Sequence, residues 1–146
     1  MFEKKVEYLE LSGQKVPIKC DLLVLEKIQE AYGDLSVFEN KLMGFVPSLD
    51  EEGNPEKNED GLQVGKYGMP DIKVLNQALI WFAEEGAVCE ECEADRPEGT
   101  DLLRMADIRP DDLGNMLHKE FMRCFERKNE SPTQKVDTRN KTNRGK

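Results

Sequence analysis

The sequence is poor in the residues and motifs that most enzymes use for chemistry. His118 is the only histidine among 146 residues, and its place in a predicted helix favours a structural role over that of a catalytic base. Neither glycine-rich phosphate-binding pattern, GxGxxG or GxxxxGK[ST], occurs in the chain. The carboxylates stand in exposed runs in which no catalytic pair can be singled out. We therefore expect a protein that is not an enzyme and that uses no cofactor.

Long apolar runs are also missing. No stretch approaches the roughly 18 apolar residues that a membrane helix needs, so no membrane partner is expected. The first residues, MFEKKVEYLEL, lack the apolar region of a signal peptide. We expect a protein that is made and kept in the cytoplasm, with its four cysteines as reduced thiols.

Charge is plentiful but unevenly distributed. The formal net charge is −9, yet residues 127–146 contain seven basic and two acidic residues, a net charge of about +5. Residues 1–126 therefore carry about −14. A body of this charge repels phosphate, so nucleic acid is an unlikely partner for the folded part. The basic segment from residue 129 onward shows no periodicity and is predicted to be a disordered tail.

The N-terminal segment has the pattern of a β-hairpin. Residues 4–11 are rich in β-formers, and Ser12-Gly13-Gln14 supplies turn residues. The return strand alternates in polarity, which places three side chains on one face: Val16, Ile18 and Cys20.

Two helix signals follow the hairpin. Asp21 can cap a first helix that ends before Gly33, a residue suited to the left-handed conformation. The predicted apolar face of this helix consists of Leu22, Leu25, Ile28 and Tyr32. A second, short helix is predicted to open with a capping box from Ser36 to Glu39 and to stop at Gly44.

Residues 45–69 are predicted to be an exposed acidic loop. Their centre, DEEGNPEKNEDG, is rich in carboxylates and in turn-forming residues. The spacing does not fit a calcium-binding EF-hand, because Pro55 replaces the required Gly and Gly61 replaces the bidentate Glu. A loop of this length in a small domain is usually functional or disordered.

The third and last helices have the strongest signals. The third starts at Pro70-Asp71 and is predicted to end at Gly86, with a broad apolar stripe of Ile72, Val74, Leu75, Ala78, Leu79, Trp81 and Phe82. Such a helix is more often central to a core than covered by a partner. The last starts at Arg109-Pro110, with an apolar face of Leu113, Met116, Leu117, Phe121, Cys124 and Phe125. A short helix from Thr100 to about Asp107 is predicted before it.

These elements predict an α+β fold that is mostly α. The N-terminal β-hairpin is followed by about four helices and a disordered C-terminal tail. We expect a single acidic helical domain over residues 1–128, including the exposed loop 45–69, and the basic tail over residues 129–146.

The pair Cys89-Glu90-Glu91-Cys92 is the one motif that suggests chemistry. A C-x-x-C pair binds zinc when a second pair of ligands completes the site, but Cys20, Cys124 and His118 do not have that spacing. Redox activity would favour a helix N-terminus, whereas this pair is predicted to follow a helix end among acidic residues that raise thiol pKa values. Cys89 and Cys92 are thus weak metal candidates and are interpreted as incidental loop cysteines.

In layout the chain resembles the tail assembly chaperones of long-tailed phages and prophages of Gram-positive bacteria. The resemblance covers about residues 3–88: the hairpin KKVEYLELSGQKVPIKC, the helical stretch DLLVLEKIQEAYGDLSVFENKL, and the helix DIKVLNQALIWFAEEGAV with its acidic Glu-Gly stop. It implies a cytoplasmic assembly factor, absent from the mature virion. Such a factor binds and solubilises the hydrophobic tape measure protein during tail morphogenesis and also helps the tail tube protein to assemble.

Apolar helix faces would supply the grip on such a client. Our hypothesis from the sequence is that the partner-binding positions lie among Leu75, Leu79, Phe82, Leu117, Phe121 and Phe125. Two alternatives stay open, namely a small regulatory or adaptor domain that binds another protein, and a zinc-stabilised module that uses Cys89 and Cys92. Self-association is a further open question.

Overall fold

The N-terminal hairpin has the predicted form. The computed structural model describes residues 6–91 and 97–126. β1 (Glu7–Leu11) pairs in antiparallel fashion with β2 (Gln14–Ile18), and the turn residues Ser12 and Gly13 have φ values of 51° and 80°. A two-residue turn with two positive φ angles matches the twist of hairpin strands. The buried side chains include the three that alternation predicts: Val16, Ile18 and Cys20.

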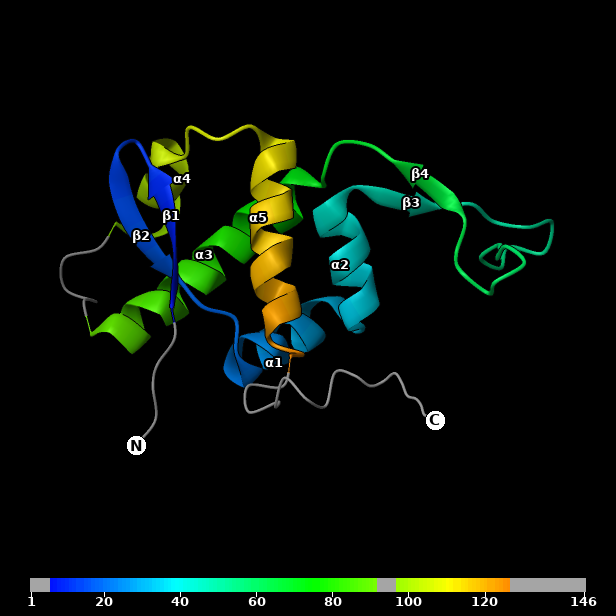
Figure 1. Cartoon of the computed structure of the whole chain (residues 1–146), viewed down its shortest axis with the longest axis horizontal. Coiled ribbons are helices and arrows are strands. Elements are labelled where there is room, and N and C mark those ends of the chain that lie inside the picture. Colours follow the sequence, from blue (N-terminus) through cyan, green and yellow to red (C-terminus); the bar gives the residue numbers. More distant parts are fainter. Residues whose placement is uncertain (1–5, 92–96, 127–146) are drawn as a thin grey trace, which may run out of the picture.

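The described residues contain five helices: α1 (Leu22–Tyr32), α2 (Leu35–Met43), α3 (Ile72–Glu90), α4 (Gly99–Met105) and α5 (Pro110–Arg123). The fold is α+β and mostly α, as the sequence predicts, and the short helix before the last one is α4 (Figure 1). The tail predicted over residues 129–146 lies outside the described residues.

Helix α3 is the centre of the core. It contacts β2 and each of the other four helices, and the backbone N–H of Lys19, just after β2, donates to the carbonyl of Phe82 at 2.9 Å. The buried side chains of α3 are Val74, Leu75, Ala78, Leu79, Phe82, Ala83 and Ala87. Each large apolar side chain contributes about 1.5–3 kcal/mol when it is removed from water. The central placement that the broad apolar stripe favoured is therefore observed.

The predicted end of α3 at Gly86 is wrong. The helix continues to Glu90, and Glu91, with a φ of 57°, is the left-handed residue that ends it. Gly86 is buried, and a Cβ atom there would lie 2.3 Å from the carbonyl oxygen of Pro17. The glycine is explained by this close approach of β2 to the helix, since glycine is the residue that lets two backbones meet.

The start of α1 is as predicted, and that of α2 is not. Asp21 Oδ1 accepts a hydrogen bond from the backbone N–H of Val24 at 3.2 Å. For α2 the cap is Asp34, whose Oδ1 accepts from the N–H of Ser36 at 2.9 Å, so the cap lies two residues before the predicted one at Ser36. The carboxylate of Glu39 is engaged elsewhere and does not reach back to the helix start.

The apolar face of α1 also differs from the prediction. Val24, Leu25 and Ile28 are its buried residues, whereas Leu22 in the first turn is 77% exposed. Spacings of three and four residues fit both stripes, so the pattern alone could not choose between them.

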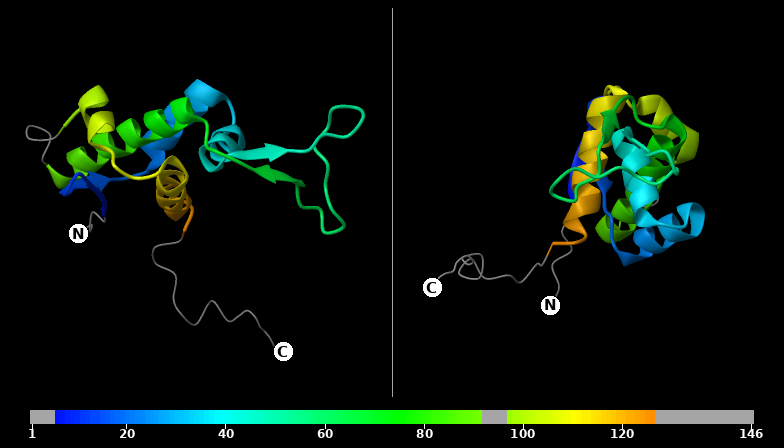
Figure 2. Two further views of the ribbon diagram at one scale, coloured as in Figure 1. Left: turned by 90° about the horizontal axis from the view of Figure 1, so that it is seen from above. Right: turned by 90° about the vertical axis from the view of Figure 1, so that its right-hand side faces the viewer.

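Residues 45–69 form a projecting arm that the sequence suggested to be a loop. In this arm, β3 (Phe45–Pro47) pairs in antiparallel fashion with β4 (Gly65–Tyr67). Farther out, the isolated bridges Leu49–Pro55 and Lys57–Gln63 each close one local turn. Strands of three residues are too short to show a period of two. Figures 1 and 2 show the arm reaching away from the helices, and the prediction that this segment is exposed is confirmed.

Candidate functional site

Five of the six residues hypothesised to face a partner lie in the core. Relative exposure is at most 3% for Leu75, Leu79, Phe82, Leu117 and Phe121. These five offer no surface to a partner in this structure, which corrects the hypothesis for them. The reason is that α3 and α5 turn their apolar faces toward each other and toward α2. Only Phe125 is exposed, at 51%, with its ring edge-on to that of Phe121.

Of the fifteen exposed large apolar side chains in the described residues, six lie on the arm, more than on any other element. These six are between 39% and 72% exposed: Val46, Leu49, Leu62, Val64, Tyr67 and Met69. Monomeric proteins rarely leave apolar residues grouped on an exposed element without a use for them, whereas single exposed residues need no explanation. The arm is therefore the strongest candidate for a binding surface among the described residues.

Two similar turns shape the outer part of the arm. In the first, Asp50 Oδ1 accepts hydrogen bonds from the backbone N–H groups of Glu52 and Asn54, both at 2.9 Å. In the second, Asn58 Oδ1 accepts from Asp60 at 2.9 Å and from Leu62 at 3.0 Å. Each turn places a glycine with positive φ at its fourth position, with φ values of 86° and 82°. The spacing of Asp or Asn to Gly is a turn signal that could have been recognised in the sequence.

The base of the arm is held by close backbone packing. Gly68 N–H donates to the carbonyl of Gly44 at 2.7 Å, and a Cβ atom on Gly44 would lie 2.3 Å from the carbonyl oxygen of Gly68. The rings of Phe45 and Tyr67 lie 5.0 Å apart between centroids. These contacts give the arm a defined root, while its outer part depends on local turns.

The arm is acidic as well as apolar. It contains six carboxylates and two lysines, and all eight are exposed: Asp50, Glu51, Glu52, Glu56, Glu59 and Asp60, with Lys57 and Lys66. Apolar side chains give an interface its area, and a surrounding net negative charge keeps the free protein soluble.

The single histidine has a structural role. His118 Nε2 on α5 lies 2.7 Å from Glu39 Oε2 on α2, and both side chains are partly buried. This contact joins the two helices, as the prediction of a structural histidine implied.

One polar group of α5 was missed at the sequence level. Glu120 is only 2% exposed, and its Oε2 accepts a hydrogen bond from the backbone N–H of Cys20 at 2.9 Å. Burial raises the pKa of this carboxyl, against the opposing effects of that hydrogen bond and of Arg123. The signal available in the sequence was its position between Leu117 and Phe121, on the buried side of the helix.

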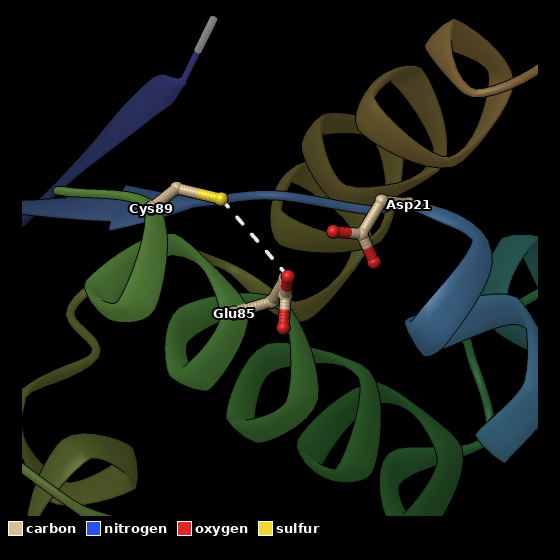
Figure 3. Close-up of side chains that lie close together, drawn as sticks. All are labelled: Asp21, Glu85 and Cys89. Atoms are coloured by element: carbon tan, nitrogen blue, oxygen red, sulfur yellow. Dashed lines mark hydrogen bonds between the residues drawn. The ribbon is translucent and has the colours of Figure 1, made fainter. Parts of the chain in front are cut away.

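Cys89 is the cysteine of the C-x-x-C pair that lies among the described residues. It belongs to the last turn of α3, whereas the sequence predicted a position beyond the helix. Its Sγ lies 4.0 Å from Glu85 Oε2, one turn earlier on the same face (Figure 3). With the carboxylate of Asp21, one ligand atom from each residue lies within 4.8 Å of the others. Cys92 lies outside the described residues.

Asp21 influences the protonation of Glu85. Burial raises the pKa of Glu85 to about 7, together with the hydrogen bond that its protonated form donates to Asp21 and the negative charge of Asp21. The positive charges of Lys27 and Lys19 act in the opposite direction. A carboxyl that is protonated near neutral pH donates a hydrogen bond to its neighbour, which relieves the repulsion between two acids. The pair can therefore share a proton without any metal ion.

The other two cysteines are part of the core. Cys20 is 3% exposed, and Cys124 packs against the same cluster of buried residues. Burial raises the thiol pKa of both cysteines, so neither is activated as a nucleophile.

None of the helices in residues 6–91 and 97–126 combines the length and the apolar content that a membrane crossing requires. In comparisons with known proteins, no protein-family model, no curated protein and no solved structure matches the chain.

Proposed function

We propose that this protein is a phage tail assembly chaperone that binds the tape measure protein in the bacterial cytoplasm and keeps it soluble during tail morphogenesis. The observation that carries the proposal is the arm, with its six exposed apolar side chains. Because residues 3–88 resemble such chaperones, we take the tape measure protein as the client. Binding, rather than catalysis, is the activity that this surface supports.

The charge of the molecule suits a holder of an apolar client. Residues 1–126 carry about −14, which keeps complexes apart and in solution. The arm reaches away from the helices (Figure 2), so that a client segment can contact it without disturbing the core. Its apolar side chains can then pack against the apolar face of a helix in the client.

Co-expression with a fragment of the tape measure protein tests the proposal. The variant Leu49→Asp/Leu62→Asp should lower the amount of client that co-purifies by about tenfold or more. Both side chains are exposed, at 59% and 63%, so the variant should fold normally. Each aspartate replaces an apolar contact by a charge that must lose its water on binding, which costs on the order of 1–3 kcal/mol.

The matched control is Leu22→Asp/Leu23→Asp on α1. These leucines are also exposed, at 77% and 61%, but they lie outside the arm. The control should retain wild-type binding, with circular dichroism spectra unchanged in both variants. If both variants bind the client equally well, the arm is not the binding surface. Phe82→Asp is unsuitable as a test because Phe82 is buried in the core.

The convergence of Asp21, Glu85 and Cys89 keeps a second candidate function in view, a zinc-stabilised module. Carboxylate and thiolate ligands both occur in zinc sites. Metal analysis of the purified protein distinguishes the chaperone from the zinc-stabilised module. The chaperone account expects less than one zinc per ten chains, whereas near-stoichiometric zinc that is lost in Cys89→Ser would establish the module.

The remaining alternative is a regulatory or adaptor domain that binds some other protein. It shares the arm as a binding surface but not the client. The genes beside the one that encodes this chain separate the two, because the chaperone account expects a tape measure gene just downstream.

A further inference from the structure

The charge of the arm is divided along its length. The outer part, residues 48–63, contains six carboxylates and one lysine, a net charge of −5, whereas Lys66 is the one charged residue of the inner part. The two outer turns lie at the end of the arm that is farthest from the helices (Figure 2). None of the six carboxylates forms an ion pair within the described residues, so the negative charge of the outer arm is open to a partner.

The inner part of the arm has an apolar face. The register places Val46 opposite Lys66, and the backbone N–H of Ser48 donates to the carbonyl of Val64 at 2.7 Å. Side chains alternate between the faces of a strand, and opposite partners share a face, so both valines lie on the same face as Lys66. The valines are exposed, at 67% and 39%.

Apolar and acidic side chains adjoin each other at the outer turns. Leu49 directly precedes the first turn, and Leu62 is the last residue of the second. Glu51 and Glu59 occupy the same position in the two turns, and all four side chains are exposed. A ligand that covers the leucines therefore comes next to the carboxylates. It must offer apolar contact and positive charge together, because a neutral surface would remove water from the carboxylates without compensation.

Neither the chain's own basic segment nor a second copy meets both requirements. Residues 127–146 carry about +5, but Val136 is their one large apolar residue. A second copy repels the first, since residues 1–126 of each carry about −14. Charge complementarity therefore favours a basic and apolar segment of another protein.

We propose that the arm binds an amphipathic helix of a protein partner, with an apolar stripe flanked by lysine or arginine residues. The stripe packs on the valine face and on the two leucines, while the basic side chains pair with the carboxylates of the outer turns. The inference rests on the proposed function for the identity of the partner and specifies which kind of client segment the arm holds. The preference of the arm can nevertheless be measured without that client.

Fluorescence anisotropy with labelled synthetic peptides and the full-length protein measures this preference. The first peptide has leucines at helical spacing and lysines elsewhere. In the second, glutamates replace the lysines, and in the third, serines replace the leucines. The first peptide should bind at least about tenfold more tightly than either of the others. Equal affinity for the first two peptides would overturn the role of charge, and equal affinity for the first and third would overturn the apolar contact.

The variant Glu51→Lys/Glu59→Lys tests whether the preference belongs to the arm. It should weaken binding of the leucine–lysine peptide by about tenfold, because each substitution replaces attraction by repulsion. The matched control, Glu26→Lys/Glu30→Lys on α1, changes the net charge equally at exposed positions outside the arm. The control should weaken binding by less than about threefold, since salt screens distant charges. Equal losses in two folded variants, checked by circular dichroism, would overturn the arm as the site.

The other possible occupants of the arm give different results. A dimer that dissociates in Leu49→Asp/Leu62→Asp, as seen by sedimentation, would assign the arm to a second copy and overturn the proposal. Arg139→Gln/Lys141→Gln should leave the affinity for the peptide unchanged. Tighter binding by this variant would assign the outer arm to the chain's own basic segment and overturn the proposal as well.

Co-purification with the tape measure fragment separates this inference from the proposed function. If the wild type does not retain the fragment, the proposed function is refuted and the peptide result stands. If the wild type and Glu51→Lys/Glu59→Lys retain the fragment equally, the proposed function stands and the basic partner helix is overturned.

Discussion

At the scale of single residues, the acidic side chains of this protein have distinct functions that composition cannot separate. Asp21 and Asp34 cap helices, Glu120 is buried on α5, and Glu85 shares its surroundings with Asp21. The cap at Asp21 could be predicted because a strand pattern ends just before it. The cap at Asp34 is equally local, but Ser36 was taken as the cap in its place. The burial of Glu120 and the proximity of Glu85 to Asp21 could not be predicted, since they arise from contacts between residues far apart in the chain.

Glu85 gives a prediction about pH. Its pKa is raised from 4.5 to about 7 in the folded protein, so the folded state binds a proton that the unfolded state releases across this window. The favourable contribution is present below about pH 4.5 and is lost as pH rises through about 7. Glu85→Gln should therefore lose less stability than the wild type between pH 5.5 and 7.5.

Urea denaturation of both proteins at these two pH values measures the effect. The wild type and the variant share all other titrating groups, so the difference between their pH dependences isolates Glu85. Identical pH dependence in the two proteins would show that the Glu85–Asp21 pair does not hold a proton in this range.

At the scale of elements, the ends of helices and the faces they bury account for most differences between expectation and structure. Gly86 was expected to end α3 because glycine usually marks a helix end, but here it admits the backbone of β2. The stripe on α3 was correctly expected to be central. One residue of the stripe predicted for α1 was wrong: Leu22 fits the helical spacing, but it lies in the first turn and is exposed.

The contact at Gly86 predicts an unusual response to alanine. In a helix interior, Gly→Ala normally stabilises by about 1 kcal/mol. Gly86→Ala should instead destabilise the protein by about 1–3 kcal/mol, because the added Cβ would lie 2.3 Å from the carbonyl oxygen of Pro17 and either β2 or α3 must shift. Urea denaturation measures the change.

The control for this prediction is Gly68→Ala. Gly68 has no atom of another part of the protein within 4 Å of an added Cβ and does not have a positive φ, so alanine should change stability by less than about 0.5 kcal/mol. A stabilised Gly86→Ala protein would mean that β2 is not seated against α3 as closely as described.

At the scale of the whole molecule, the sequence was a good guide to the fold and a poor guide to the proposed binding surface. The hairpin and the helices could be predicted from turns, caps and periodicity. The surface could not, because a core stripe and a partner stripe have the same spacing, and Leu75 or Phe121 fits either. The arm was correctly predicted to be exposed. Its apolar residues could not be recognised as a surface, because acidic and turn residues separate them in the sequence.

The central claim is that the protein binds its client through the arm. Hydrogen exchange of the free protein, compared with the complex with the tape measure fragment, tests it most directly. The outer arm lies far from the core and its turns are closed by local hydrogen bonds, so its amides should exchange rapidly in the free protein. Residues 45–69 should exchange at least about tenfold more slowly in the complex. Unchanged exchange across residues 45–69, with protection appearing elsewhere, would contradict the account.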